Sequence, residues 1–304
     1  MESVDRIDAQ AIAEKYFGIQ ASAHELPSER DRNFLLTANV REKFVLKIAN
    51  AREKEEVLDA QNAMLSHLAD RVSFCPRVVP ALSGEQIVTV ENHFVRVLSW
   101  LPGKPLAKAE IQSPELLYDF GRKLGQLSCA LGSFDHPALH RDFHWDLMKG
   151  PQIIKKYGPR IKVDKLRELV LGYQKLSVEK LRLSVIHGDA NDYNVLVEEN
   201  KVVGVIDFGD VVYSYTVGDL AIAVAYVVLG KEDPRAAVAP VIEGYREEFE
   251  LTQSELDALW PLVRLRLCMS VCIAAYQQEN DLENEYLGIS QKLIAETLPR
   301  LINH

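Results

Sequence analysis

The sequence predicts an α+β fold of two lobes, a small antiparallel-sheet lobe followed by a larger, mainly helical lobe. Short β-rich runs are concentrated before residue 100, whereas the apolar spacing typical of helices dominates after it. Residues 100–105 contain two prolines and a glycine, which indicates a hinge that continues neither kind of element. A chain of 304 residues is long enough for two lobes. We therefore expect an N-terminal lobe over residues 1–99 and a C-terminal lobe over residues 100–304.

The N-terminal lobe is expected to mix two helices with antiparallel strands. Asp8 is a candidate N-cap for the first helix, and Met64, Leu65 and Leu68 give the second helix an apolar stripe. Two β-rich runs flank the charged turn at residues 41–43, which predicts a hairpin. The expected helices and strands cover residues 8–17, 34–40, 44–48, 53–69, 86–90 and 94–99.

Helices are expected through most of the C-terminal lobe. Ser113 followed by Pro114 is a typical helix start, with serine as the N-cap and proline in the first turn. Asp219, near the start of another apolar helix, is expected to be a helix cap or an internal hydrogen-bond acceptor. One strand-like segment, residues 185–207, interrupts the helices. The further helices are expected over residues 162–180, 217–229, 234–250, 253–277 and 283–302.

Composition and charge disfavour two classes of partner. The formal net charge is −9, which disfavours nonspecific nucleic-acid binding and suits a cationic small substrate. No apolar run is expected to reach the roughly 18 to 20 residues that span a bilayer, and the longest candidate, residues 220–229, is expected to be a buried helix. The N-terminus is acidic and lacks the apolar segment of a secretory signal. We expect neither a nucleic-acid nor a membrane partner.

The four cysteines are expected to be buried free thiols. Cys75, Cys129, Cys268 and Cys272 all lie in apolar surroundings. Cys268 and Cys272 are four residues apart on an expected helix and so share a face, but no histidine or aspartate joins them at metal-ligand spacing. Free thiols and the missing signal together predict a reducing, cytoplasmic location.

The most informative part of the chain contains two short motifs, each of which follows a β-branched apolar run. The first, H-x-D-x-x-x-x-N, consists of His187, Asp189 and Asn194, and the second, D-F-G, begins at Asp207. Either motif alone could be an ordinary turn, because Gly, Asn and Asp favour turns. A turn does not explain the asparagine five residues after the aspartate together with an acidic strand end. The combination indicates phosphoryl transfer, in which one carboxylate orients the acceptor hydroxyl while an amide and a second carboxylate hold Mg²⁺ on the nucleotide phosphates.

Further polar residues near the motifs are candidates for contact with the acceptor. Asp192 and Asp210 would place negative charge beside it, which suits an amine or ammonium substrate. Trp145 could hold a cation against its ring or anchor the core, and Asp146 next to it belongs to the same polar and aromatic cluster. Arg141 is a candidate for binding a substrate carboxylate.

The order of these parts resembles the aminoglycoside phosphotransferase and choline kinase superfamily, and within it the hydroxylysine kinase branch. The chain carries a hairpin with Lys47, a helix, further strands, a hinge and a helical lobe with both motifs, so the likeness covers nearly all of it. The resemblance implies a bilobal, protein-kinase-like fold and a kinase that uses ATP or GTP with Mg²⁺. The segments that carry the likeness are residues 44–48, 95–103, 139–147, 187–194 and 207–210.

The resemblance also implies residue roles in both lobes. Asp189 would be the catalytic base, and His187 would support its loop or, as a second possibility, transfer a proton. Asn194 and Asp207 would bind Mg²⁺, which prefers oxygen ligands. The nucleotide-binding residues would be Lys47, Ser28, Arg32, Ser99 and Leu101. The acceptor-binding residues would be Asp192, Asp210, Trp145 and Asp146.

Two features depart from the pattern of the superfamily. Residues 26–34 stand where a glycine-rich loop would cover the phosphates, and they contain no glycine. The segment is either a charged turn or a loop whose side chains assist in phosphate binding, and the donors available are Ser28, Arg30 and Arg32. Gln61 stands where a glutamate would pair with the lysine, so the partner of Lys47 stays open. The nearby acids are Asp59, Glu56 and Glu55.

The first hypothesis is therefore a small-molecule kinase. It would transfer the terminal phosphoryl of GTP or ATP directly to the hydroxyl of an amino-bearing alcohol, with 5-hydroxylysine as the best single acceptor. No cysteine or serine nucleophile lies in the motif loop to suggest a covalent step. Homoserine, choline, ethanolamine and aminoglycosides are the alternative acceptors. A catalytically idle nucleotide-binding module is the second hypothesis and a metal-dependent phosphohydrolase is the third, while the oligomeric state is not predicted.

Overall fold

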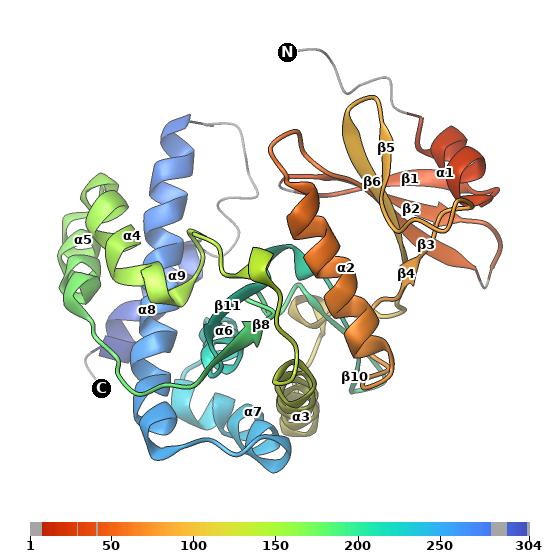
Figure 1. The fold of residues 1–304 in the computed structure, drawn as a ribbon. Helices are drawn as coiled ribbons and strands as arrows, with labels where there is room; N and C mark the ends of the chain where they lie inside the picture. The colour runs from red at the N-terminus through yellow and green to blue at the C-terminus, as the bar shows by residue number, and fades with distance from the viewer. Residues whose placement is uncertain (1–7, 29, 41, 281–290, 303–304) are drawn as a thin grey trace. The chain divides into compact units, whose positions relative to one another are not determined.

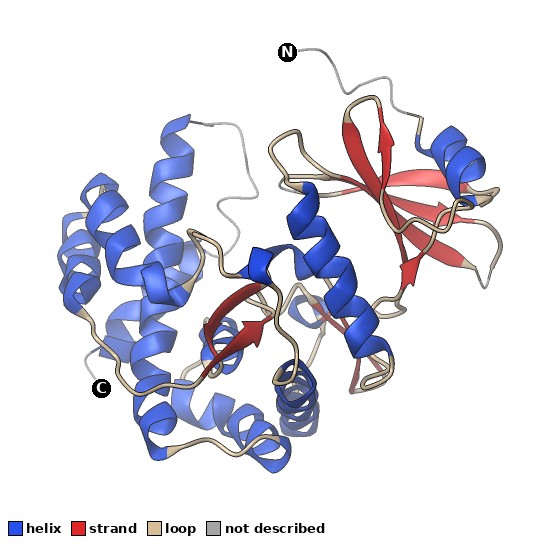
Figure 2. Cartoon of the chain, viewed as in Figure 1, coloured by secondary structure: helices blue, strands red, loops and turns tan. Residues whose placement is uncertain are grey.

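The chain folds into two compact units (Figure 1). The computed structural model describes residues 8–28, 30–40, 42–280 and 291–302. Unit 1 is Met1–Pro102 and unit 2 is Gly103–His304, so the division falls within the proline- and glycine-rich segment at residues 100–105. A six-stranded sheet dominates unit 1 and helices dominate unit 2, which confirms the predicted α+β fold (Figure 2). The acidic N-terminus at residues 1–5 and the turn residue Arg41 lie outside the described residues.

Unit 1 is built on a sheet whose strands run antiparallel in the order β1-β2-β3-β6-β4, with β5 paired to β6. The predicted hairpin is confirmed as β2 and β3, in which Asn33 lies opposite Lys47. β1 was not expected, because its sequence does not alternate between apolar and polar residues and most of its side chains are exposed. The strands are β1 (Ser22–Leu26), β2 (Arg32–Thr37), β3 (Lys43–Ile48), β4 (Val78–Val79), β5 (Val88–Val90) and β6 (His93–Ser99).

The two faces of this sheet contact different helices. Leu46 and Ile48 are buried in a core that also contains the apolar side chains of α1 (Ala9–Phe17). Side chains alternate along a strand, so Lys47 points to the opposite face. On that face α2 (Glu55–Ala69) is hydrogen-bonded to the sheet. The alternation of β3 therefore separates an apolar core face from a face that carries charge.

Unit 2 contains most of the helices. Ser113 caps the first of them by accepting a hydrogen bond from the backbone N–H of Leu116 at 3.2 Å, as its sequence predicts. The helix expected over residues 162–180 is shorter than predicted, because it gives way to a 3-10 turn at Gly172–Lys175, and α4 was not expected. The start of the last expected helix, at residues 281–290, lies outside the described residues. The helices are α3 (Pro114–Leu131), α4 (Gly150–Tyr157), α5 (Asp164–Leu171), α6 (Gly218–Val227), α7 (Pro234–Glu248), α8 (Gln253–Asn280) and α9 (Gln291–Ile302).

Short strands of unit 2 flank the two motif loops. The strand-like segment is confirmed as a hairpin of β9 and β10, and β7 adds a third strand beside β9. β8 pairs instead with β11, a strand that directly follows the D-F-G motif and was not expected. The strands are β7 (Lys104–Pro105), β8 (Leu183–Ile186), β9 (Val195–Glu198), β10 (Lys201–Val205) and β11 (Val212–Tyr215).

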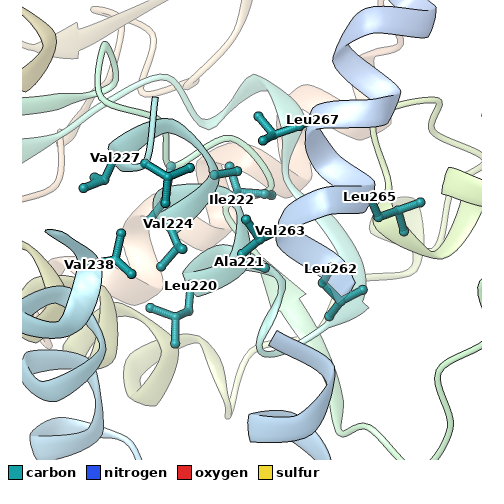
Figure 3. Packing of buried hydrophobic residues seen from close by; sticks show 14 of the residues in the cluster. Leu220, Ala221, Ile222, Val224, Val227, Val238, Leu262, Val263, Leu265 and Leu267 are labelled. Carbon is teal, nitrogen blue, oxygen red and sulfur yellow. The ribbon is translucent and has the colours of Figure 1, made fainter. Parts of the chain in front are cut away.

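The centre of unit 2 is an apolar core around α6 and α8 (Figure 3). α8 packs against α4, α6 and α9, and the side chains of Leu262, Val263 and Leu267 on it are fully buried. By length and composition alone α8 could cross a membrane, with a mean hydropathy of 1.6 over its most apolar window, so the expectation that no segment qualifies was wrong. Inside the protein 78% of that window is buried, which is typical of a central core helix.

The cysteine predictions are confirmed with one exception. All four cysteines are free, and Cys75, Cys268 and Cys272 are buried. Cys129 is exposed, because it lies near the end of α3, where its thiol contacts the backbone carbonyl of Glu248 at 3.0 Å. Within the described part of the chain, no group of three or more His, Cys, Asp or Glu side chains forms a metal cluster.

Helices α3 and α7 approach each other closely through two glycines. A Cβ atom added at Gly121 would collide with the backbone carbonyl of Val241, and one at Gly244 would collide with that of Tyr118. Close contact of the two backbones is possible only because neither residue has a side chain. The close packing of α3 against α7 in unit 2 therefore depends on both glycines.

We expect Gly244→Ala to destabilise the protein by about 1–3 kcal/mol or more, because the helices would have to move apart to admit the methyl group. Gly172→Ala is the matched control, since a Cβ there meets nothing within 4 Å. Thermal unfolding of both variants measures the difference. Equal melting temperatures for the two variants would show that the helix contact tolerates the extra volume.

Candidate active site

The pairing of the short strands brings the two motifs together. Ile186 at the end of β8 lies opposite Val212 at the start of β11, and Val195 at the start of β9 lies opposite Val205 at the end of β10. The loop that carries the first motif therefore begins and ends beside the loop that carries the second. The backbone N–H of Ile206 donates to the carbonyl of Asn194 at 2.9 Å, which joins the two loops directly.

Asp219 holds the beginning of the first motif loop. Its carboxylate accepts a hydrogen bond from the backbone N–H of His187 at 2.9 Å and a second one from that of Gly188 at 2.9 Å. Burial raises the pKa of Asp219, although the hydrogen bonds from the two N–H groups act in the opposite direction. The expectation of an internal hydrogen-bond acceptor is confirmed.

Gly188 allows the two loops to approach each other. It has a φ of +80°, and a Cβ atom there would collide with the carbonyl oxygen of Asp210 in the second motif loop. Only glycine satisfies both conditions without strain.

His187 is fully buried between the loops. Its Nδ1 accepts from the backbone N–H of Asp189 at 3.2 Å, so the ring proton lies on Nε2, which donates to the carbonyl of Ile206 at 3.0 Å. Its ring also packs on that of Phe208 at a centroid distance of 4.6 Å. Both ring nitrogens are engaged by backbone, which favours loop support over proton transfer as the role of this histidine.

Asp189, the candidate base, is held by side chains on both of its carboxylate oxygens. Oδ2 accepts from the side-chain amides of Asn191 and Asn194, each at 2.9 Å. Oδ1 accepts from Nη2 of Arg266 at 2.7 Å. These bonds fix the plane of the carboxylate relative to the loop.

The groups around Asp189 shift its pKa in opposite directions. Its side chain keeps 22% of its surface exposed, yet the group lies deep enough that burial raises its pKa to about 7. Arg266 acts to lower that pKa, whereas the nearby carboxylates of Asp210 and Asp207 raise it further. A pKa near neutrality suits a group that must accept a proton during the reaction.

Arg266 is the residue that the sequence reasoning missed. It lies on α8, has 2% of its side chain exposed, and places its guanidinium 4.5 Å from the centre of the Trp145 ring. An arginine between Leu265 and Leu267 on a helix with an apolar core was the available signal, because a buried charge requires a charged or polar partner. The sequence alone does not reveal that the partner is Asp189.

Asn194 and Asp207 present oxygen atoms that fit a hard divalent cation. Nδ2 of Asn194 donates to the backbone carbonyl and to Oδ2 of Asp189, so its Oδ1 is the end that can bind metal. Asp207 has a left-handed backbone (φ 63°, ψ 71°), which is uncommon for a residue other than glycine and is found preferentially at functional sites. An amide and one carboxylate suffice for Mg²⁺, because that ion usually takes its other ligands from phosphates and water.

The four candidate acceptor residues are placed differently. Asp192 lies in the first motif loop, where burial raises its pKa to about 6 and Lys231 acts to lower it. Asp210 is 8% exposed and close enough to raise the pKa of Asp189. Asp146 is buried, caps a 3-10 turn and accepts from the hydroxyl of Ser214.

Trp145 and Arg141 have contacts within the protein. The cation over the Trp145 ring is the guanidinium of Arg266. Arg141 donates from Nη2 to the backbone carbonyls of Gly209 and Val211, each at 2.9 Å, and so supports the D-F-G loop. Of the acceptor candidates, Asp210 is the one whose charge acts on the pKa of the candidate base.

The candidate nucleotide residues lie in unit 1. Lys47 on β3 lies directly opposite Arg96 on β6, so both side chains point to the same face of the sheet. The side-chain oxygens of Gln61 and Asn62 on α2 accept hydrogen bonds from the guanidinium of Arg96, the Asn62 bond being 3.0 Å long. The residue expected in place of the lysine's acidic partner therefore binds Arg96. The nearby acids Asp59, Glu56 and Glu55 are exposed.

The remaining nucleotide candidates are placed as follows. Arg32 forms a bidentate ion pair with Glu25 on the neighbouring strand, in which Nε donates to Oε1 at 2.9 Å and Nη2 donates to Oε2 at 3.2 Å. Ser28 is exposed in the loop between β1 and β2. The hydroxyl of Ser99 accepts from the backbone N–H of Arg77 at 2.8 Å, and Leu101 is half-buried just after β6.

Comparison with known proteins identifies the family. The model of the phosphotransferase enzyme family (APH) matches residues 22–259, which include both motifs and Lys47. The chain belongs to the phosphotransferase enzyme family. This phosphotransferase is a small-molecule kinase with an alcohol group as the acceptor, and the resemblance to the superfamily is confirmed.

Individual relatives are similar to this chain over most of its length. The phosphotransferase is 31% identical to a hydroxylysine kinase of Danio rerio over 95% of this chain and 89% of the relative. It is 32% identical to a hydroxylysine kinase of Mus musculus over 93% of this chain and 85% of the relative. A homoserine kinase of Zymomonas mobilis subsp. mobilis is 28% identical, over 76% and 73% of the two chains.

Solved structures share the fold of the phosphotransferase. Amicoumacin kinase hAmiN in complex with AMP-PNP, Ca²⁺ and Ami matches with a TM-score of 0.72 and 16% identity, over 97% of this chain and 95% of that one. The microcompartment-associated aminopropanol kinase matches with a TM-score of 0.70 and 18% identity, over 96% and 95%. These likenesses confirm the kinase-like fold.

We expect Asp219→Asn to lower both stability and turnover of the phosphotransferase. The amide can accept from only one of the two backbone N–H groups, and leaving the other unsatisfied in a buried site costs about 1–3 kcal/mol. Asp8→Asn is the control, because Asp8 also accepts from two backbone N–H groups but at an exposed helix start where asparagine serves equally well. Thermal unfolding and steady-state turnover measure the effect, and wild-type behaviour of Asp219→Asn would refute this role.

Proposed function

We propose that this phosphotransferase transfers the terminal phosphoryl of ATP or GTP to the hydroxyl of 5-hydroxylysine, with Mg²⁺ as the metal. The observation that carries this choice is the identity of about 30% to hydroxylysine kinases over nearly the whole of both chains. The homoserine kinases are less similar and match a smaller share of the chain. Unit 1 would bind the nucleotide, and unit 2 would supply the base and the acceptor site.

The charge of the site supports an acceptor that carries an amine. Asp189, Asp207 and Asp210 lie near one another around the two motif loops, and each of the latter two raises the pKa of the first. Asp192 adds a fourth carboxylate on the same loop as Asp189. An ammonium group close to the reacting hydroxyl would offset the mutual repulsion of these carboxylates. 5-Hydroxylysine has such a group on the carbon next to the one that bears the hydroxyl.

Asp189 would orient the acceptor hydroxyl and take its proton as the new phosphorus–oxygen bond forms. An alcohol is far too weak an acid to be deprotonated beforehand, so positioning contributes more than basicity. Asn194 and Asp207 would hold Mg²⁺, which when bound neutralises charge on the nucleotide phosphates. Asn194 also donates to Asp189, so a single amide links the base to the metal ligands.

We expect Asp189→Asn to reduce kcat by about 10²–10⁴-fold, because the amide keeps the shape of the side chain but cannot accept a proton. Nucleotide affinity should stay near that of wild type. Asp142→Asn is the control, since that carboxylate is 89% exposed and pairs with Lys149 rather than with Asp189. Loss of nucleotide binding in Asp189→Asn, with kcat unchanged at saturation, would mean that Asp189 is not the base.

The acceptor is tested by release of nucleoside diphosphate from the purified protein with Mg²⁺ and either ATP or GTP. We expect 5-hydroxylysine to stimulate release strongly, and homoserine, choline, ethanolamine and an aminoglycoside to stimulate it weakly. Asp207→Asn is the negative control, because asparagine tolerates the left-handed backbone but lacks the metal-binding charge. Stronger stimulation by homoserine than by 5-hydroxylysine would overturn the proposed acceptor and leave the kinase standing.

A further inference from the structure

Arg266 is a deeply buried cation in contact with the first motif loop. Only 2% of its side chain is exposed, and its neighbours Leu265 and Leu267 on α8 are buried in the apolar core. Apolar side chains of similar volume generally stabilise such a position as well as a buried ion pair does, or better. Stability alone therefore does not explain an arginine at this place.

The contacts of Arg266 are directed at the candidate base and its surroundings. Nη2 donates to Oδ1 of Asp189 at 2.7 Å, and Nη1 donates to the backbone carbonyl of Trp145 at 3.4 Å. The guanidinium lies over the ring of Trp145, with the ring of Tyr226 at 5.8 Å. The planar group is thus fixed by hydrogen bonds at its edge and by an aromatic ring on its face.

These contacts define the position of the Asp189 carboxylate. Its Oδ2 is bound by the amides of Asn191 and Asn194 from within the loop, whereas its Oδ1 is bound only by Arg266 among the partners that the described residues provide. Without Arg266 the carboxylate would keep its loop contacts but lose the one contact that anchors it to the helical core. Arg266 is also the nearest cation to offset the charge of Asp189.

The contact joins two different parts of the chain. Asp189 lies within residues 22–259, which match the family model, whereas Arg266 lies beyond them. The base therefore comes from the first motif loop and the group that orients it comes from helix α8.

We propose that Arg266 is a positioning residue for Asp189, holding the carboxylate at the angle at which it meets the acceptor hydroxyl. The inference rests on the proposed role of Asp189 as the base. A lysine cannot replace Arg266, because a single ammonium cannot reproduce the planar group that binds Asp189 and stacks on Trp145. A small displacement of a catalytic group can lower a rate by about a hundredfold.

The test compares Arg266→Lys and Arg266→Ala with wild type, and Arg264→Lys serves as the matched control. Arg264 lies two residues earlier on the same helix and interacts with Tyr173 rather than with the motif loops. We expect both Arg266 variants to lower kcat by about a hundredfold while the KM for the nucleotide stays within about threefold of wild type. Arg264→Lys should keep wild-type kcat, and added guanidinium should restore part of the activity of Arg266→Ala.

A double-mutant cycle separates positioning from a general structural role. If Arg266 acts through Asp189, Arg266→Ala should cause no further loss of kcat in an Asp189→Asn background. The same fractional loss in both backgrounds, or wild-type kcat in the two single Arg266 variants, would overturn the proposal.

Failure of the proposed acceptor is distinguishable from failure of this inference. Hydrolysis of the nucleotide by water would use the same base but needs no acceptor, so the same variants are also compared without 5-hydroxylysine. Crystal structures of Arg266→Ala and of wild type provide a readout that needs no turnover. We expect the Asp189 carboxylate to rotate in the variant, and an unchanged carboxylate position would refute the positioning role.

Discussion

The carboxylate of Asp219 accepts the backbone N–H groups of His187 and Gly188, and the geometry of both motif loops depends on this pair of hydrogen bonds. Asp219 lies in the first turn of α6, a helix buried in the core of unit 2, so the loop takes its position from that core. His187 in turn donates a hydrogen bond to the backbone carbonyl of Ile206, which holds the second motif loop beside the first. One buried carboxylate thereby places the candidate base and the candidate metal ligands on a common framework.

Local sequence signals predicted the parts of the fold whose causes are local. The N-caps Asp8 and Ser113, the β2–β3 hairpin and the β9–β10 hairpin all follow from turn, capping or strand preferences of neighbouring residues. β7 and β11 were missed because each is short and is defined by its partner strand. In the same way the motif residues were found from their spacing, whereas the role of Arg266 was not, because its partner Asp189 lies far away in the sequence.

In unit 1 the side-chain amides of Gln61 and Asn62 bind Arg96, so the departure from the superfamily pattern at Gln61 is accompanied by a different contact. Gln61 was recognised from the sequence as a missing acid, but its new partner, Arg96, could be found only from the register of β3 and β6. Hydrogen bonds from Arg96 to Gln61 and Asn62 therefore connect α2 to the sheet, and these two bonds need no carboxylate.

The charge balance around Asp189 links catalysis to the helical core. Asp207 and Asp210 disfavour its ionised form, and Arg266 favours it, so the protonation of the base depends on groups from the second motif loop and from α8. Displacement of α8 would weaken the contribution of Arg266, whereas the carboxylates of Asp207 and Asp210 would still disfavour the ionised form. Because α8 is also the helix on which α4, α6 and α9 pack, the packing that stabilises unit 2 and the electrostatics that prepare the base cannot vary independently.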